Sequence, residues 1–130
     1  ECDFSANGYR LPTHKEWEYA ARGGNGLEGY QFQYAGSDSL DEVAVWNTDV
    51  VSEIKTKKPN GLGIYDLNGN IEEWTFDRYK GKENILYAGG YYFYKQPDAF
   101  ALSRSYAGCM AITLTARNSQ IGLRVVCTAD

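Results

Sequence analysis

The chain has 130 residues, with 13 Lys and Arg against 17 Asp and Glu, giving a formal net charge of −4 at pH 7. This length fits one domain, residues 1–130, and leaves no room for a second catalytic domain. The sequence has no basic stripe, which argues against nucleic-acid binding, and no apolar run near the ~18 residues of a membrane span.

The N-terminal part of the chain contains the clearest helix pattern. Thr13 and Glu16 have the spacing of a capping box. Trp17 begins an apolar stripe, and the pair Gly23-Gly24 predicts the end of the helix. His14 is the one histidine, and we expect it to be solvated on the first turn.

The remaining chain consists of long loops and short strand patterns. Residues 23–63 contain many turn signals, with one short strand expected over 43–46. Further strands are predicted over residues 71–76, 85–88, 91–94 and 121–126. One early helix followed by short strands indicates an α+β domain. Loops of this length require a metal, a disulfide or a function to explain them.

The cysteine count is odd. Cys2 and Cys127 lie at the two ends of the chain, and Cys109 is the third. Because chain termini often lie close together, a disulfide between Cys2 and Cys127 is plausible, which leaves Cys109 unpaired. That disulfide would indicate an oxidising compartment. The alternative is three reduced thiols in a cytosolic protein.

Aromatic side chains are unusually frequent, with 11 Tyr, 5 Phe and 3 Trp. Four of them are consecutive, from Tyr91 to Tyr94, and strand neighbours point to opposite faces. At least two should therefore face outward. If the segment 111–115 lies beside them, an exposed apolar and aromatic patch results, which is typical of an interaction site. The alternative is a strand that covers a small core.

Four sequence blocks carry a family resemblance: residues 8–24, residues 61–74, Gly89-Gly90 and residues 121–126. In this order they resemble the formylglycine-generating-enzyme-like (sulfatase-modifying factor) family. The resemblance implies a C-type-lectin-like fold with a small twisted antiparallel sheet, few helices, long loops and neighbouring termini. It also implies that residues 1–130 are the C-terminal portion of the family domain.

The resemblance implies one structural calcium site. Its ligands would be the Asp66 side chain, the carbonyls of Gly69 and Ile71, and Glu73. Ca²⁺ prefers six or more oxygen ligands of this mixed kind. In the alternative arrangement Asp66 accepts hydrogen bonds from loop amides and Glu73 meets an arginine.

The redox chemistry of the family is not expected. Formylglycine-generating members carry a cysteine pair shortly after the Gly-Gly block, and it holds copper(I), for which thiolates are suitable ligands. Here the first cysteine after that block is Cys109, which stands alone. Because His14 is the single histidine, the chain cannot form a three-histidine iron site. It also has no other imidazole that could act as the base of a catalytic triad. We therefore expect no copper and no enzymatic activity.

A second branch of the family matches better. Residues 117–124 resemble the tail of the variable proteins of diversity-generating retroelements, which use this surface as a receptor for ligands. The resemblance implies that the binding residues are Tyr91, Tyr92, Phe93, Tyr94, Tyr106, Ala111, Ile112, Thr113, Leu114, Thr115, Asn118 and Gln120.

The sequence thus predicts a non-enzymatic module, exported or displayed at the cell surface, including as a lipoprotein. Its ligand would be an unknown protein or small molecule. One alternative is a formylglycine-generating-type oxidase or the accessory subunit of a related enzyme. Another is a plain structural domain of a larger surface protein.

Overall fold

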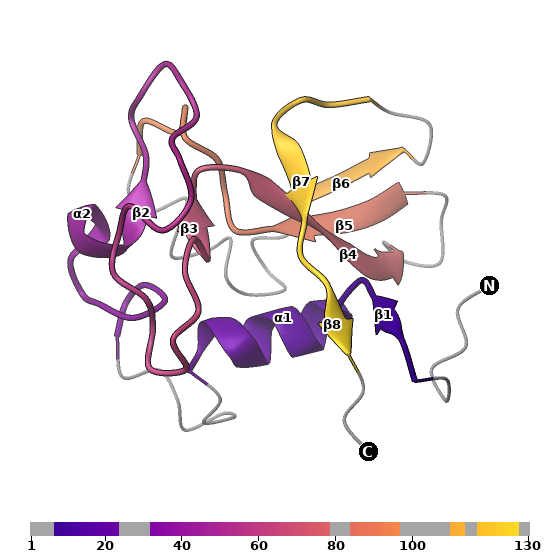
Figure 1. The fold of residues 1–130 in the computed structure, drawn as a ribbon. Helices are drawn as coiled ribbons and strands as arrows, with labels where there is room; N and C mark the ends of the chain where they lie inside the picture. Colours follow the sequence, from indigo (N-terminus) through magenta and orange to yellow (C-terminus); the bar gives the residue numbers. More distant parts are fainter. Residues whose placement is uncertain (1–6, 24–31, 79–83, 97–109, 114–116, 128–130) are drawn as a thin grey trace.

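The computed structural model describes residues 7–23, 32–78, 84–96, 110–113 and 117–127. Within these ranges the chain forms two helices and eight strands around one four-stranded sheet (Figure 1). In chain order the elements are β1 (Tyr9–Arg10), α1 (His14–Ala21), α2 (Leu40–Val43), β2 (Ala44–Val45), β3 (Asn68–Gly69), β4 (Glu72–Arg78), β5 (Asn84–Ala88), β6 (Met110–Thr113), β7 (Ile121–Leu123) and β8 (Val126–Cys127). The expected α+β class is confirmed. No helix of the described ranges is long and apolar enough to cross a bilayer.

The main sheet has the strand order β6-β5-β4-β7. β5 is antiparallel to both of its neighbours, whereas β7 pairs with β4 in parallel. The expected antiparallel pairing therefore holds for β4–β5 and β5–β6, and the parallel pair β4–β7 makes the sheet mixed. β6 and β7 consequently run in the same direction at opposite edges, which a tight hairpin between them cannot achieve.

Helix α1 forms where the capping box predicts it. The Thr13 hydroxyl accepts a hydrogen bond from the Glu16 amide at 3.2 Å, and the Glu16 carboxylate accepts one from the Thr13 amide at 2.7 Å. The helix lies against β4 and β5 on one side of the sheet (Figure 1). Trp17 and Ala21 are buried there and share a core cluster with Ala88 of β5. The helix thus places Trp17 against the start of β4 and the end of β5.

His14 is buried, with 2% of its surface exposed, so the expectation of a solvated histidine is wrong. Its backbone amide donates a hydrogen bond to the Asp77 carboxylate of β4. This contact brings the first turn of α1 against the sheet, which is why the side chain does not face solvent. Burial lowers the pKa of His14, although Glu18 and Asp77 act in the opposite direction.

Residues 91–94 form a turn, so the strand predicted there is wrong. Gly89 and Gly90 have φ angles of 97° and 70°, in the left-handed region that glycine adopts readily. The Tyr94 amide then donates to the Tyr91 carbonyl at 3.1 Å and closes the turn. A Cβ on Gly89 would lie 3.3 Å from Cζ2 of Trp17, so the contact with α1 also favours glycine.

The C-terminal strand pattern divides into two short strands. β7 ends at Leu123, and β8 then pairs with β1 in the register Tyr9 to Cys127. The prediction of one strand over 121–126 is therefore correct only in part. The β1–β8 pair makes the first and last strands neighbours, as the family resemblance implies.

Candidate functional site

Two successive glutamates begin β4, and both are buried. Glu72 has 4% of its surface exposed and Glu73 has 8%. Because neighbouring strand residues point to opposite faces, the two carboxylates enter different environments. Glu73 faces α1, where it meets Trp17, and Glu72 faces the turn that contains Tyr94.

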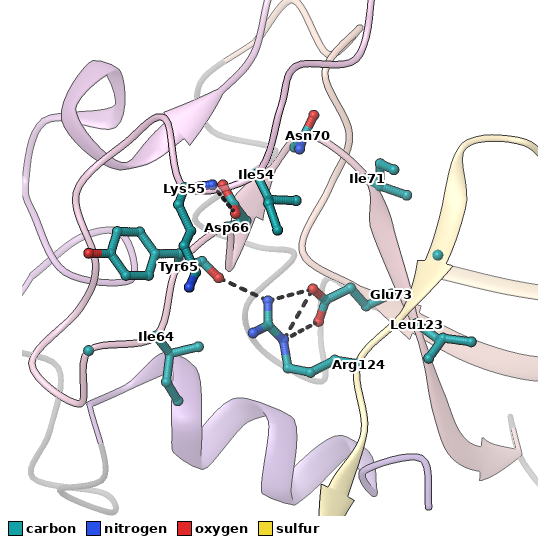
Figure 2. A pocket seen from close by; sticks show the side chains of 12 residues that line it. Ile54, Lys55, Ile64, Tyr65, Asp66, Asn70, Ile71, Glu73, Leu123 and Arg124 are labelled. Carbon is teal, nitrogen blue, oxygen red and sulfur yellow. Dashed lines mark hydrogen bonds and ion pairs between the residues drawn. The ribbon is translucent and has the colours of Figure 1, made fainter.

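The Glu73 carboxylate is held by two side-chain partners, Trp17 and Arg124. The Trp17 indole Nε1 donates to Oε2 at 2.7 Å. The Arg124 guanidinium donates from Nη2 to Oε1 at 2.7 Å and from Nε to Oε2 at 2.9 Å, and its Nη2 also reaches the Tyr65 carbonyl at 2.9 Å (Figure 2). Burial acts to lower the pKa of Arg124, but the bonds to Glu73 outweigh it and hold that pKa above its ordinary value. Glu73 and Arg124 therefore form a charge-balanced, bidentate pair.

A depression of about 460 Å³ opens beside this pair. Its volume lies within the usual range for small-molecule sites. Two of its lining residues, Ile54 and Leu123, are strongly exposed apolar side chains (Figure 2). The lining residues are Ile54, Lys55, Gly63, Ile64, Tyr65, Asp66, Asn70, Ile71, Glu73, Gly122, Leu123 and Arg124.

Three of the four predicted calcium ligands meet at this depression. Asp66, Ile71 and Glu73 line it, whereas Gly69 lies on β3 and is not among the lining residues. Asp66 has a φ of 59°, and its Oδ2 accepts a hydrogen bond from the Lys55 amide at 2.8 Å. In the described ranges, no group of three or more His, Cys, Asp or Glu side chains is arranged to hold a metal ion.

The geometry corresponds to the alternative arrangement considered for these residues. Asp66 binds a loop amide, and Glu73 meets Arg124. As placed, Glu73 does not fit a Ca²⁺ site, because both of its oxygens accept N–H donors and its charge is balanced by a cation. Binding Ca²⁺ would require Glu73 to exchange Arg124 for the ion, so the calcium site stays a prediction.

On the opposite face, the aromatic turn surrounds Glu72. The Tyr94 hydroxyl donates to Oε1 of Glu72 at 2.9 Å. The Tyr91 ring packs edge-on against Tyr94, with centroids 4.5 Å apart, and against Tyr92 at 5.7 Å. These three tyrosines are half-buried, and Phe93 is exposed. The predicted cluster of rings therefore exists, and one of its side chains, Phe93, is exposed.

Burial changes the acidity of this pair. It raises the pKa of Glu72 to about 7, although the hydrogen bond from Tyr94 acts in the opposite direction. Burial and the neighbouring Glu72 carboxylate raise the pKa of Tyr94 as well. Glu72 thus changes charge near neutral pH, where an ordinary glutamate is fully ionised.

Backbone hydrogen bonds fix the aromatic turn in place. The Thr48 amide donates to the Tyr92 carbonyl and the Asn47 amide donates to the Tyr94 carbonyl, both at 3.0 Å. The Tyr92 amide donates to the Asn70 carbonyl at 3.1 Å, just before β4. The rings are therefore carried by a turn that is bonded to two other segments.

The structure describes some of the other predicted ligand-binding residues, and they lie on two different elements. Asn118 and Gln120 are half-buried in the turn before β7, where the Asn118 side chain accepts from the Gln120 amide at 2.8 Å. The Gln120 carbonyl accepts from the Glu72 amide at 3.0 Å, which places this turn beside the start of β4. Ala111, Ile112 and Thr113 belong to β6, which pairs with β5. Tyr106, Leu114 and Thr115 lie outside the described residues.

The predicted disulfide is described at one end only. Cys127 is exposed on β8, opposite Tyr9 of β1. Cys2 lies outside the described residues, as does Cys109, so the pairing stays a prediction.

Sequence reasoning missed Glu72 and Arg124 as parts of the site. The signal for Glu72 is the pair Glu72-Glu73 inside a strand pattern, since one member of such a pair must face inward whichever way the strand lies. No sequence signal shows that strand β7 ends at Leu123 or that the Arg124 side chain then contacts Glu73.

Comparison with known proteins gives matches over most of the chain. The model of the Sulfatase-modifying factor enzyme 1-like domain matches residues 2–129. Chaperone protein LppX of Paenibacillus barcinonensis is 40% identical over 92 aligned residues, covering 55% of this chain and 32% of that protein. Inactive C-alpha-formylglycine-generating enzyme 2 of Bos taurus is 34% identical over 92 residues, covering 61% of this chain and 30% of that protein. The chain thus spans about a third of the length of these curated relatives.

Among solved structures, Treponema denticola variable protein 1 superposes with a TM-score of 0.78 at 28% sequence identity, covering 98% of this chain and 50% of that one. This likeness, with the small sheets and few helices of the described ranges, confirms the C-type-lectin-like fold. The relatives include both a variable protein and a protein whose name states that it is inactive.

Proposed function

The chain belongs to the family of the sulfatase-modifying factor enzyme 1-like domain, and we propose that it is a non-enzymatic, receptor-like module that binds its ligand through its C-terminal segment. The observation that carries the proposal is the likeness to Treponema denticola variable protein 1 over 98% of the chain. The similarity to an inactive relative is consistent with it.

The cysteine positions support a loss of the redox chemistry. Between Gly90 and the C-terminal strand pair the sequence contains Cys109 alone, whereas copper(I) in this family is held by a cysteine pair. Tyr94, which follows Gly90 by four residues, hydrogen-bonds to Glu72. Aromatic and carboxyl groups therefore occupy the region after the Gly-Gly block.

The proposed binding surface is the aromatic turn 91–94 together with the variable residues that follow it. Phe93 is 45% exposed, and the three tyrosines are half-buried, so each ring offers some contact area to a ligand. Tyr side chains provide such area at low entropic cost. The partner class is a protein or a small molecule, and the net charge of −4 disfavours nucleic acid.

We further propose that a retroelement diversifies this segment. The test is genomic: we expect a near-copy of the codons for residues 91–120 close to the gene, differing from it at adenines. Sequencing of many cells should then show substitutions confined to those codons. A genome without such a copy contradicts the diversification.

The alternative, an oxidase of the formylglycine-generating type or its accessory subunit, is favoured by the family match itself. It predicts that copper(I) titration removes thiol signal from the reduced protein stoichiometrically. Our proposal predicts weak binding at Cys109 alone and no oxidation of a cysteine peptide. Measured turnover of such a peptide would exclude the non-enzymatic function.

We also propose export or surface display, including as a lipoprotein, with a Cys2–Cys127 disulfide. That disulfide would join segments next to the β1–β8 pair. Mass spectrometry of the exported protein should find the Cys2 and Cys127 peptides linked. The proposed calcium site predicts a higher melting temperature with Ca²⁺ than with a chelator, and an unchanged temperature would remove it.

A further inference from the structure

Glu72 is a buried carboxylate for which the described chain supplies no cation. Two acidic side chains of the described ranges are buried, Glu72 and Glu73, and Glu73 is paired with Arg124. None of the five ion pairs in these ranges involves Glu72, whose single side-chain hydrogen bond there comes from the neutral Tyr94 hydroxyl. A buried charge normally requires a partner of opposite charge.

In the described part of the chain, the side chain that contacts the Glu72 carboxylate is that of Tyr94, and other aromatic rings pack around this tyrosine. Tyr94 bonds to Glu72 from the turn, Tyr91 packs on Tyr94, and Tyr87 of β5 acts on the acidity of Tyr94. The rings of Tyr91 and Tyr92 are half-buried, so part of each meets solvent. Aromatic faces attract cations within about 6 Å of the ring centre.

The same turn already binds a cation of its own on its outer side. The Lys95 ammonium lies 4.5 Å from the centre of the Phe93 ring and 3.8 Å from the Asp49 carboxylate. A ring and a carboxylate thus hold this ammonium together. At Glu72, a tyrosine ring and a carboxylate are combined without an ammonium from any described residue.

We propose that Glu72 and the rings of Tyr91, Tyr92 and Tyr94 bind an organic cation, the ammonium group of the ligand. The inference rests on the proposed function, since it assigns a chemistry to the ligand of that surface. The cation lies against the half-buried rings, and the carboxylate behind them supplies the charge in a medium of low dielectric constant.

The experiment uses choline and its uncharged analogue 3,3-dimethyl-1-butanol, which have nearly the same shape. We expect choline to bind about tenfold more tightly at pH 8, measured by chemical-shift titration of the tyrosine ring resonances. Nα-acetyl-lysine methylamide is the second probe: tighter binding of choline indicates a free small cation, and tighter binding of the lysine probe indicates a side chain of a partner protein.

Two variants keep the inference falsifiable. Glu72→Gln should lower choline affinity about tenfold, whereas Glu53→Gln, which removes a glutamate charge at an exposed position, should leave that affinity unchanged. Tyr91→Leu, which keeps the bulk but removes the ring, should lower affinity several-fold, by about 3–10 times. Spectra of each variant show whether it is folded.

Equal binding of choline and the uncharged analogue overturns the cation inference but leaves a binding surface in place. The same holds for choline affinity that Glu72→Gln does not change. Absence of binding by both cations at tens of millimolar also overturns the inference. The genomic test of diversification is independent of all three outcomes.

Discussion

The two faces of β4 each bury a glutamate side chain, but the two carboxylates have different partners. On the α1 face, Glu73 is held by Trp17 and by a bidentate bond to Arg124, so its charge is balanced. On the other face, Glu72 is equally buried, but its partner is the Tyr94 hydroxyl. Burial is therefore not what distinguishes the two carboxylates; the presence of a cation is.

The difference indicates a structural role for Glu73 and supports the proposed binding role of Glu72. The Glu73 carboxylate accepts hydrogen bonds from Trp17 of α1 and from Arg124 between β7 and β8. Arg124 also donates to the Tyr65 carbonyl in the loop before β3, so the ion pair joins segments far apart in sequence. Glu72 contacts a turn that carries four consecutive aromatic residues. A buried group left without charge compensation is typical of functional sites rather than of packing.

The largest expected effect comes from breaking the Glu73 face. Arg124→Met leaves Glu73 buried without its cation, which typically costs about 3–5 kcal/mol in the free energy of unfolding. Urea unfolding at pH 7 measures this loss.

The matched control is the double variant Glu73→Gln with Arg124→Met. It should be more stable than Arg124→Met alone, because no charge then remains unpaired, and the cycle gives a coupling energy of about 1–3 kcal/mol. A loss below about 1 kcal/mol in the single variant would show that the pair does not hold the fold together.

The Glu72 face should instead respond to pH. Its pKa is raised from 4.5 to about 7, so the folded state keeps a proton that the unfolded state has released between these values. The contribution of Glu72 to stability is therefore full below pH 4.5 and is lost as the pH rises to about 7. As the pH rises over this range, the free energy of unfolding of Glu72→Gln should increase by roughly 2–3 kcal/mol relative to that of the wild type.

Urea unfolding at closely spaced pH values measures this difference, with Glu53→Gln as the control at an exposed position. A difference that stays constant from pH 4.5 to 8 would mean that Glu72 is charged throughout, and the contrast between the two faces would disappear.

The smallest effect is expected from the hydroxyl that contacts Glu72. Tyr94→Phe removes a hydrogen bond that lowers the pKa of Glu72, so that pKa should rise above about 7. The cost in stability at pH 8 is about 1 kcal/mol, the usual value of one hydrogen bond. Carbon-13 titration of the glutamate carboxyl groups follows the pKa directly. Tyr91→Phe, whose hydroxyl makes no hydrogen bond in the described part of the chain, should leave it unchanged; an equal shift in both variants would contradict the assignment.

Local sequence signals predicted the elements whose causes are local. The capping box of Thr13 and Glu16 specifies the start of α1 from within one turn of chain. The alternating pattern of residues 71–76 likewise matches β4, although the strand extends to Arg78. The family blocks implied the C-type-lectin-like fold before any contact was known.

The predictions that proved wrong concern residues whose conformation or burial depends on contacts with distant segments of the chain. The pattern 91–94 satisfies strand propensity, but the close approach of Trp17 to Gly89 and the left-handed glycines redirect the chain into a turn. His14 is buried because β4 approaches the first turn of α1, which no local pattern records.

The sequence by itself therefore determined the family, the first helix and the region that carries the rings. The tertiary structure alone decided which of two adjacent glutamates pairs with a cation. Arg124 reaches Glu73 because strand β7 ends at Leu123 and β8 begins only at Val126. Charge compensation inside a protein depends on the distance between side chains in space, and the order of residues along the chain does not specify that distance.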